Sequence, residues 1–110
     1  MSKASYWQRG EALDYTNTTN VTIEANTVIK FGSHVGVAGT DILPNEVGTL
    51  HVTGIFEMPK TGTEAIEMGT DVYFDGEGIT DTKGDDTVLA GYAIQAATAS
   101  DTVILVKLAG

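Results

Sequence analysis

Residues 47–58 read V-G-T-L-H-V-T-G-I-F-E-M, and this stretch decides the fold class. Its side chains alternate between apolar and polar, and a period of two predicts a β-strand with one buried and one solvated face. Ile55 is the exception on the polar face, and Gly54 is a position where a strand can bend or bulge. We expect the strand to stop at Pro59, which has no N–H to donate. The apolar parity comprises Leu50, Val52, Phe56 and Met58, and the polar parity comprises Thr49, His51, Thr53 and Glu57.

Shorter alternating or β-branched runs on both sides of this stretch predict further strands. They are separated by clusters of Gly, Asn, Asp and Thr, which are typical of tight turns. The one credible helical turn lies in residues 60–69, where Gly62 and Gly69 would keep it short. About nine short strands with frequent turns predict an all-β fold, a small sandwich or barrel. The other expected strands are residues 13–16, 20–24, 27–31, 34–38, 72–74, 88–97 and 102–108.

Length and composition indicate one domain with an N-terminal arm. We expect residues 1–17 to form the arm and the first strand, and residues 18–110 to form the β domain. No internal repeat is apparent, and no linker is long enough to separate two domains. The absence of cysteine rules out disulfides and cysteine-based zinc sites. No apolar run is long enough to cross a bilayer, and the first residues do not resemble a signal peptide.

The charge excludes two classes of partner. The chain has 15 acidic and 6 basic residues, which gives a formal net charge of −9. Such a surface repels the phosphates of nucleic acids and anionic membranes. We therefore expect neither a nucleic-acid nor a membrane partner.

Two groups of residues invite a chemical interpretation. His34 and His51 could hold a metal with a carboxylate, but their spacing matches no metal motif, so we interpret them as solvated or interface histidines. Residues 75–86 gather acidic oxygens as calcium loops do, but their spacing fails the EF-hand pattern, and Asp-Gly is common in hairpin turns. We expect no metal, no cofactor and no catalytic residues.

The residues before the first strand are better candidates for a contact site. Tyr6, Trp7 and Arg9 are of the residue types that concentrate binding energy at protein interfaces. The aromatic pair could instead anchor inward on the chain's own fold. We expect Tyr6, Trp7 and Arg9 to contact a partner protein or a neighbouring subunit.

Five segments together carry a resemblance to a known family. The chain opens with Y-W-Q-R-G-E-A-L-D-Y-T-N and continues with A-N-T-V-I-K-F-G-S-H-V-G-V-A-G-T-D-I and V-G-T-L-H-V-T-G-I-F-E-M-P-K. It closes with M-G-T-D-V-Y-F-D-G and L-A-G-Y-A-I-Q-A-A-T-A-S-D-T-V-I-L-V-K-L. Nearly the whole chain resembles the DUF2190 family of small phage proteins, known as capsid cement or decoration proteins. The most specific element is the end of the long strand, residues 54–60.

This resemblance implies both a fold and a function. It implies a compact β-rich domain, β-tulip or β-clip-like, with an extended N-terminal arm. The implied function is to bind the major capsid protein on the outer surface of the mature head and stabilise it, after synthesis in the host cytoplasm. A homo-oligomer is implied, with a trimer favoured over a dimer. The alternative class is a free-standing β-rich module that binds a ligand or polymer without catalysis.

Overall fold

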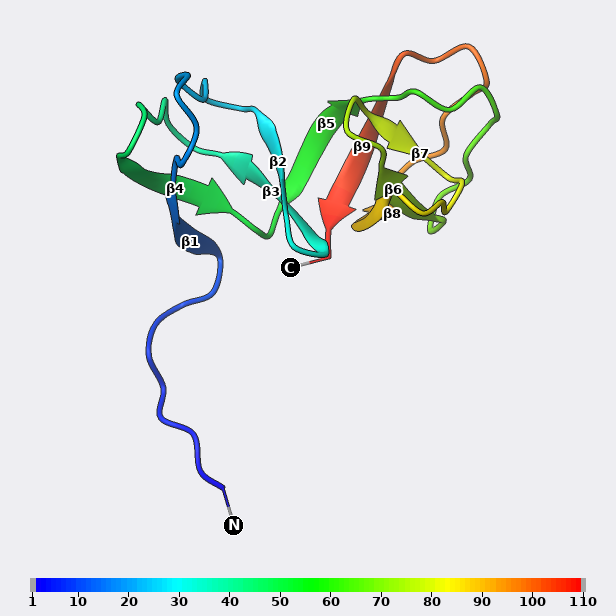
Figure 1. Cartoon of the computed structure of the whole chain (residues 1–110). Helices are drawn as coiled ribbons and strands as arrows, with labels where there is room; N and C mark the ends of the chain where they lie inside the picture. Colours follow the sequence, from blue (N-terminus) through cyan, green and yellow to red (C-terminus); the bar gives the residue numbers. More distant parts are fainter. Residues whose placement is uncertain (1, 110) are drawn as a thin grey trace.

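The computed structural model describes residues 2–109 and contains two antiparallel β-sheets without a helix among these residues (Figure 1). The expectation of an all-β fold is confirmed. The first sheet has the order β1-β4-β3-β2, and the second has the order β5-β9-β8-β6-β7. The strands are β1 (Ala12–Thr16), β2 (Val28–Phe31), β3 (His34–Ala38), β4 (Val47–His51), β5 (Ile55–Pro59), β6 (Asp71–Phe74), β7 (Ile79–Thr80), β8 (Val88–Ala93) and β9 (Val103–Leu108).

The expectation of one continuous strand over residues 47–58 is wrong, because the structure has two strands there. The chain breaks at Gly54, whose φ of 114° is open to glycine and strained for other residues. β4 lies before the break in the first sheet, and β5 lies after it in the second. The alternation nevertheless holds on both sides, because Leu50, Val52 and Met58 are all buried. Alternate side chains of this stretch therefore contribute to the cores of both sheets.

The helical turn expected within residues 60–69 is also wrong. Ile66 instead forms an antiparallel bridge with Ala97. Its N–H donates to the Ala97 carbonyl at 2.9 Å, and the N–H of Ala97 returns the bond at 2.8 Å. Gly69, with a φ of 87°, then turns the chain into β6. Bridging buries Ile66 almost completely, at 1% exposure, so an extended segment serves the core better than one isolated helical turn.

The two sheets repeat one strand arrangement, which the sequence analysis does not reveal. In the first unit (residues 12–52) the order is β1-β4-β3-β2, and in the second unit (residues 55–108) the equivalent strands run β5-β9-β8-β6. The register agrees as well. Leu13 faces Leu50 as Phe56 faces Val106. Ala38 faces Leu50 as Ala93 faces that same Val106. The chain therefore contains an internal structural repeat.

The loops of the two units follow the same repeat. An antiparallel bridge joins Ile23 to Ile42 in the first unit, as the bridge at Ile66 does in the second. The residue after the first strand is a buried polar one in each unit, Asn17 and Lys60. The Asn17 N–H donates to Glu46 at 2.9 Å, and the Lys60 N–H donates to Thr102 at 2.9 Å. Positions 17 and 60 are therefore equivalent, and the numbering of the repeat can be carried from one unit to the other.

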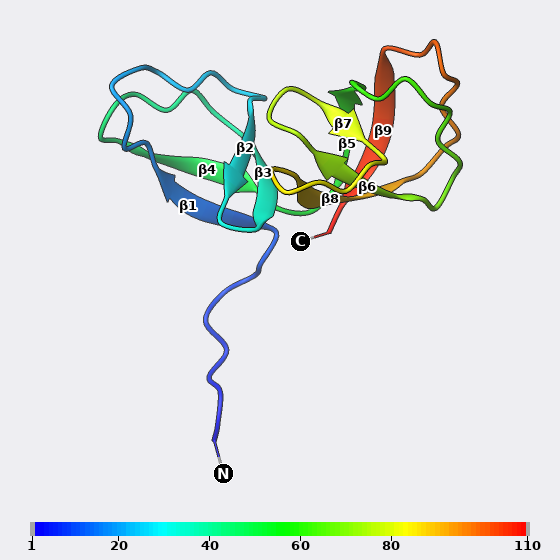
Figure 2. The same cartoon turned by 45° about the vertical axis from the view of Figure 1, so that its right-hand side comes forward.

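The two units pack against each other through β2 and β3. Figures 1 and 2 show these two strands on the side of the first sheet that is nearest to the second sheet. Val35 and Val37 are buried in the core of the second unit, and Val28 packs against it. This contact joins the units into one domain. The rest of that larger core comprises Met58, Ile66, Val72, Phe74, Ile79, Val88, Ala90, Ala93, Ala97, Ile104, Val106 and Leu108. The core of the first unit comprises Ile29, Ala38, Ile42, Leu50 and Val52.

Candidate interaction surface

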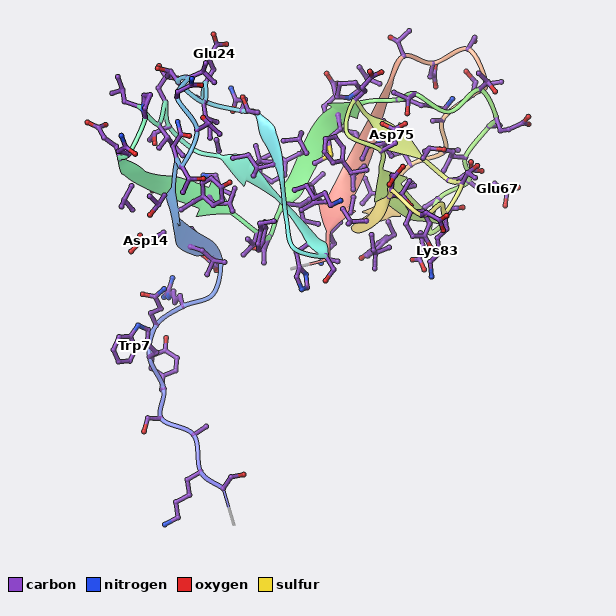
Figure 3. The ribbon with its side chains drawn as sticks, viewed as in Figure 1. Trp7, Asp14, Glu24, Glu67, Asp75 and Lys83 are labelled. Atoms are coloured by element: carbon purple, nitrogen blue, oxygen red, sulfur yellow. The ribbon has the colours of Figure 1, made fainter. Side chains whose placement is uncertain are left out.

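The arm (residues 2–10) is the most accessible part of the described chain. It belongs to no strand and leaves the domain at the start of β1 as an extended segment (Figure 1). Tyr6 is 84% exposed and Trp7 is 89% exposed, so neither aromatic residue is anchored in the core of its own domain. Arg9 is exposed as well. Figure 3 shows Trp7 on this arm, outside the sheets. The structure thus places all three expected contact residues together, in a position to reach another molecule.

The charge of the arm is opposite to that of the domain. The arm carries Lys3 and Arg9 and no acidic residue. All 15 acidic side chains and only four basic ones lie in residues 11–110, which gives this part a net charge of −11. Because opposite charges attract, the cationic arm favours a contact with an acidic surface. The anionic domains of two copies repel each other.

Neither histidine takes part in a cluster that suggests chemistry. His34 stacks on Phe31 with ring centroids 5.8 Å apart, and His51 lies 6.4 Å from the ring of Phe56. Among residues 2–109, no group of three or more His, Asp or Glu side chains could hold a metal ion. In the same range, no helix is suited to spanning a membrane.

The acidic segment of residues 75–86 is organised as a turn around Asp75. Its Oδ1 accepts the N–H groups of Glu77 and Gly78 at 2.9 Å each. Its Oδ2 accepts the hydroxyl of Thr61 at 2.6 Å, which ties the turn to the end of β5. Desolvation disfavours the charged form, but the hydrogen bonds, with Thr61 first, outweigh it and hold the pKa of the Asp75 carboxyl below its ordinary value.

Asp75→Asn is expected to lower stability at neutral pH and to have less effect in acid. Because the folded pKa is the lower one, the carboxylate stabilises the fold above its unfolded pKa, and this contribution disappears as pH falls through the folded pKa. Urea midpoints of the wild type and the variant should differ at about pH 7 and converge near about pH 2. The control is Asp86→Asn, an exposed carboxylate of the same segment. A gap for Asp75→Asn that is independent of pH would contradict this assignment.

The first unit is more open than the second at equivalent positions. Phe31 is half-buried, whereas its counterpart Phe74 is only 7% exposed. Tyr15 is half-buried, whereas its counterpart Met58 is 1% exposed. Leu13 lies two residues before Tyr15, on the same face of β1, and is 37% exposed. These side chains share the face that carries the core of the first unit, so part of that core lies uncovered.

Two buried polar residues, Asn17 and Lys60, hold the loops after β1 and β5. Asn17 donates from Nδ2 to the carbonyls of Val21 at 2.7 Å and Ile42 at 2.9 Å, and thereby holds the loop after β1. Lys60 has the same role after β5, where Nζ donates to Gly62 at 2.7 Å. The sequence gives a turn signal at Asn17 but nothing that predicts burial of a lysine. Burial of both is tolerated because their polar atoms are hydrogen-bonded.

Comparison with models of known protein families identifies a match to nearly the whole chain. A family model described as phage cement protein matches residues 7–108 of the chain. The matched range includes Trp7 and Arg9 and both structural units. No match was found among curated proteins or among solved structures.

Proposed function

The chain belongs to the phage cement proteins, a structural family associated with the phage capsid, and from that premise we propose that it binds the outer surface of the mature head and stabilises it. A protein that binds the expanded shell in preference to other states stabilises that shell by its binding free energy. Many identical sites on the lattice add modest contacts into a large barrier to rupture.

The proposed partner is the major capsid protein, and the proposed contact residues are Tyr6, Trp7 and Arg9. In this proposal residues 1–17 form the arm and first strand, and residues 18–110 form the β domain. The protein acts as a homo-oligomer, a trimer rather than a dimer, because closed cyclic symmetry suits a lattice axis. It acts without catalysis or a cofactor. The observation that carries this proposal is the family match over residues 7–108, and the exposed aromatic arm supports it.

Purified protein is expected to co-sediment with expanded heads and not with unexpanded proheads. Selective binding follows because a protein can stabilise one state only by its differential affinity for that state. Both particle forms would be incubated with a concentration series of the protein, and the pelleted fraction would be measured. The control is the protein centrifuged without particles. Equal binding to the two forms would remove the stabilising mechanism, and binding to neither would favour the free-standing module.

A further inference from the structure

The second unit contains a strand that the first unit lacks. β7 is the edge strand of the second sheet and pairs with β6, where Phe74 faces Ile79 and Tyr73 faces Thr80. It also reaches β5, because Ile79 forms a parallel bridge with Lys60. The N–H groups of Thr61 and Gly62 donate to the Ile79 carbonyl at 2.9 and 3.3 Å. Ile79 itself is fully buried. β7 thus curls the sheet and covers its core.

In the first unit the corresponding position is open, and we call it the slot. β2 and β3 are joined directly through Gly32 and Ser33, with no segment equivalent to β7. The slot lies between the edge strands β1 and β2, where Tyr15 and Phe31 are only half-buried. Thr18 is equivalent to Thr61, and its N–H makes no backbone hydrogen bond among the described residues. The slot therefore offers an apolar floor and a free donor at the place where β7 closes the second unit.

The arm has the properties that the slot requires. It is extended and unpaired, and it carries two exposed aromatic side chains. Its charge of +2 complements residues 12–52, which carry four acidic side chains and Lys30 alone as a base, a net charge of −3. It leaves β1 from the end opposite the slot and points away from its own domain (Figure 1). A neighbouring copy is therefore the natural acceptor.

We propose that the arm of one copy lies as an extended strand in the slot of a neighbouring copy, where Tyr6 or Trp7 takes the place that Ile79 has in the second unit. Strand addition supplies backbone hydrogen bonds, and the inserted side chain supplies buried apolar area. The repetition of this exchange around an axis closes an oligomer. The inference deepens the proposed oligomer and rests on it, but it does not depend on binding to a phage head.

Disulfide trapping tests this exchange cleanly, because the natural chain contains no cysteine. One chain carries Ser5→Cys or Gln8→Cys, which flank the aromatic pair without altering it. The second chain carries Thr18→Cys and a tag that changes its size. The matched control is Thr61→Cys, the equivalent position in the unit that β7 already closes. All four positions are exposed, and circular dichroism checks the fold of every variant.

Mixed chains oxidised together should form a disulfide between chains of different size. The yield with Thr18→Cys should exceed the yield with Thr61→Cys by about tenfold or more. Equal yields would overturn the proposal. A chain carrying both Gln8→Cys and Thr18→Cys that links only within itself would show that the arm folds back on its own domain, which also overturns it.

Light scattering gives an independent measurement. The full-length protein should be an oligomer, and a variant without residues 2–10 should have the mass of a monomer while keeping its β-sheet dichroism. An oligomer that survives this deletion, or a full-length monomer, would overturn the exchange. Because these measurements use no phage particles, failed exchange with intact head binding leaves the proposed function standing.

Discussion

Gly91→Ala is expected to prevent the protein from folding stably. Gly91 lies in β8 opposite Leu108 of β9, in the centre of the second sheet. A Cβ atom added there would overlap the carbonyl oxygen of Lys107 and lie 2.8 Å from its carbonyl carbon. These are backbone atoms in a central strand, so they cannot move aside as the end of a side chain can. We expect a loss of about 4 kcal/mol or more, a large part of the roughly 5–15 kcal/mol that stabilises a domain.

The repeat supplies a graded series for this measurement. Gly36 occupies the equivalent position in β3, where a Cβ atom would first meet Leu50 side-chain atoms at 2.7 and 2.8 Å and then the carbonyl oxygen of His51 at 2.9 Å. We expect a smaller loss there, because the side chain of Leu50 can shift. Gly84→Ala meets nothing closer than Thr87 at 3.9 Å and should change stability by no more than about 0.5 kcal/mol. Urea unfolding followed by circular dichroism would rank the three variants. A folded Gly91→Ala protein with the stability of Gly84→Ala would contradict the packing described for β8 and β9.

Side-chain alternation predicts most of the fold because burial selects the same parity in both units. Leu50 in the first sheet and Met58 in the second have the same parity along the chain, and each is a core residue at 1% exposure. What alternation cannot predict is where the chain changes sheets. That change needs only a short turn with one positive φ, at Gly54, and it leaves the parity on both sides unaltered.

The internal repeat is hidden in the sequence for a physical reason. A few equivalent positions keep the residue type, such as Phe31 and Phe74, but others share only a place in the fold: Tyr15 corresponds to Met58, and Asn17 corresponds to Lys60. A core position demands volume and a loop anchor demands a donor, and different residues satisfy each demand. The repeat is therefore visible in strand order and register, which are properties of pairing between distant segments.

One part of the candidate contact site can be predicted from the sequence, and the other part cannot. Residue type alone singles out Tyr6, Trp7 and Arg9, and the structure places them on an exposed arm. The slot could not be predicted from sequence, because it is defined by the absence of a strand that the other unit possesses. Phe31 and Tyr15 look like ordinary core residues until they are compared with Phe74 and Met58.

Trp7→Ala is expected to weaken binding to phage heads while leaving the domain folded. Trp7 is 89% exposed in the single chain, so its removal costs the core nothing. A tryptophan that becomes buried at an interface commonly contributes about 2 kcal/mol, or close to 30-fold in affinity. Ser5→Ala, on the same arm, is the matched control and should bind as the wild type does. Circular dichroism, light scattering and a head-binding titration would be run on each variant.

The three measurements together identify what Trp7 contacts. Loss of the oligomer together with weaker head binding is the expected result, because a protein that binds through several linked copies loses avidity when it becomes a monomer. Weaker head binding by an intact oligomer would place Trp7 on the capsid, which refutes the exchange of arms but keeps the cement function. Loss of the fold would place Trp7 in the domain's own core, contrary to its exposure here. Unchanged binding and assembly would mean that the arm is passive and that the acidic β domain alone makes the contact.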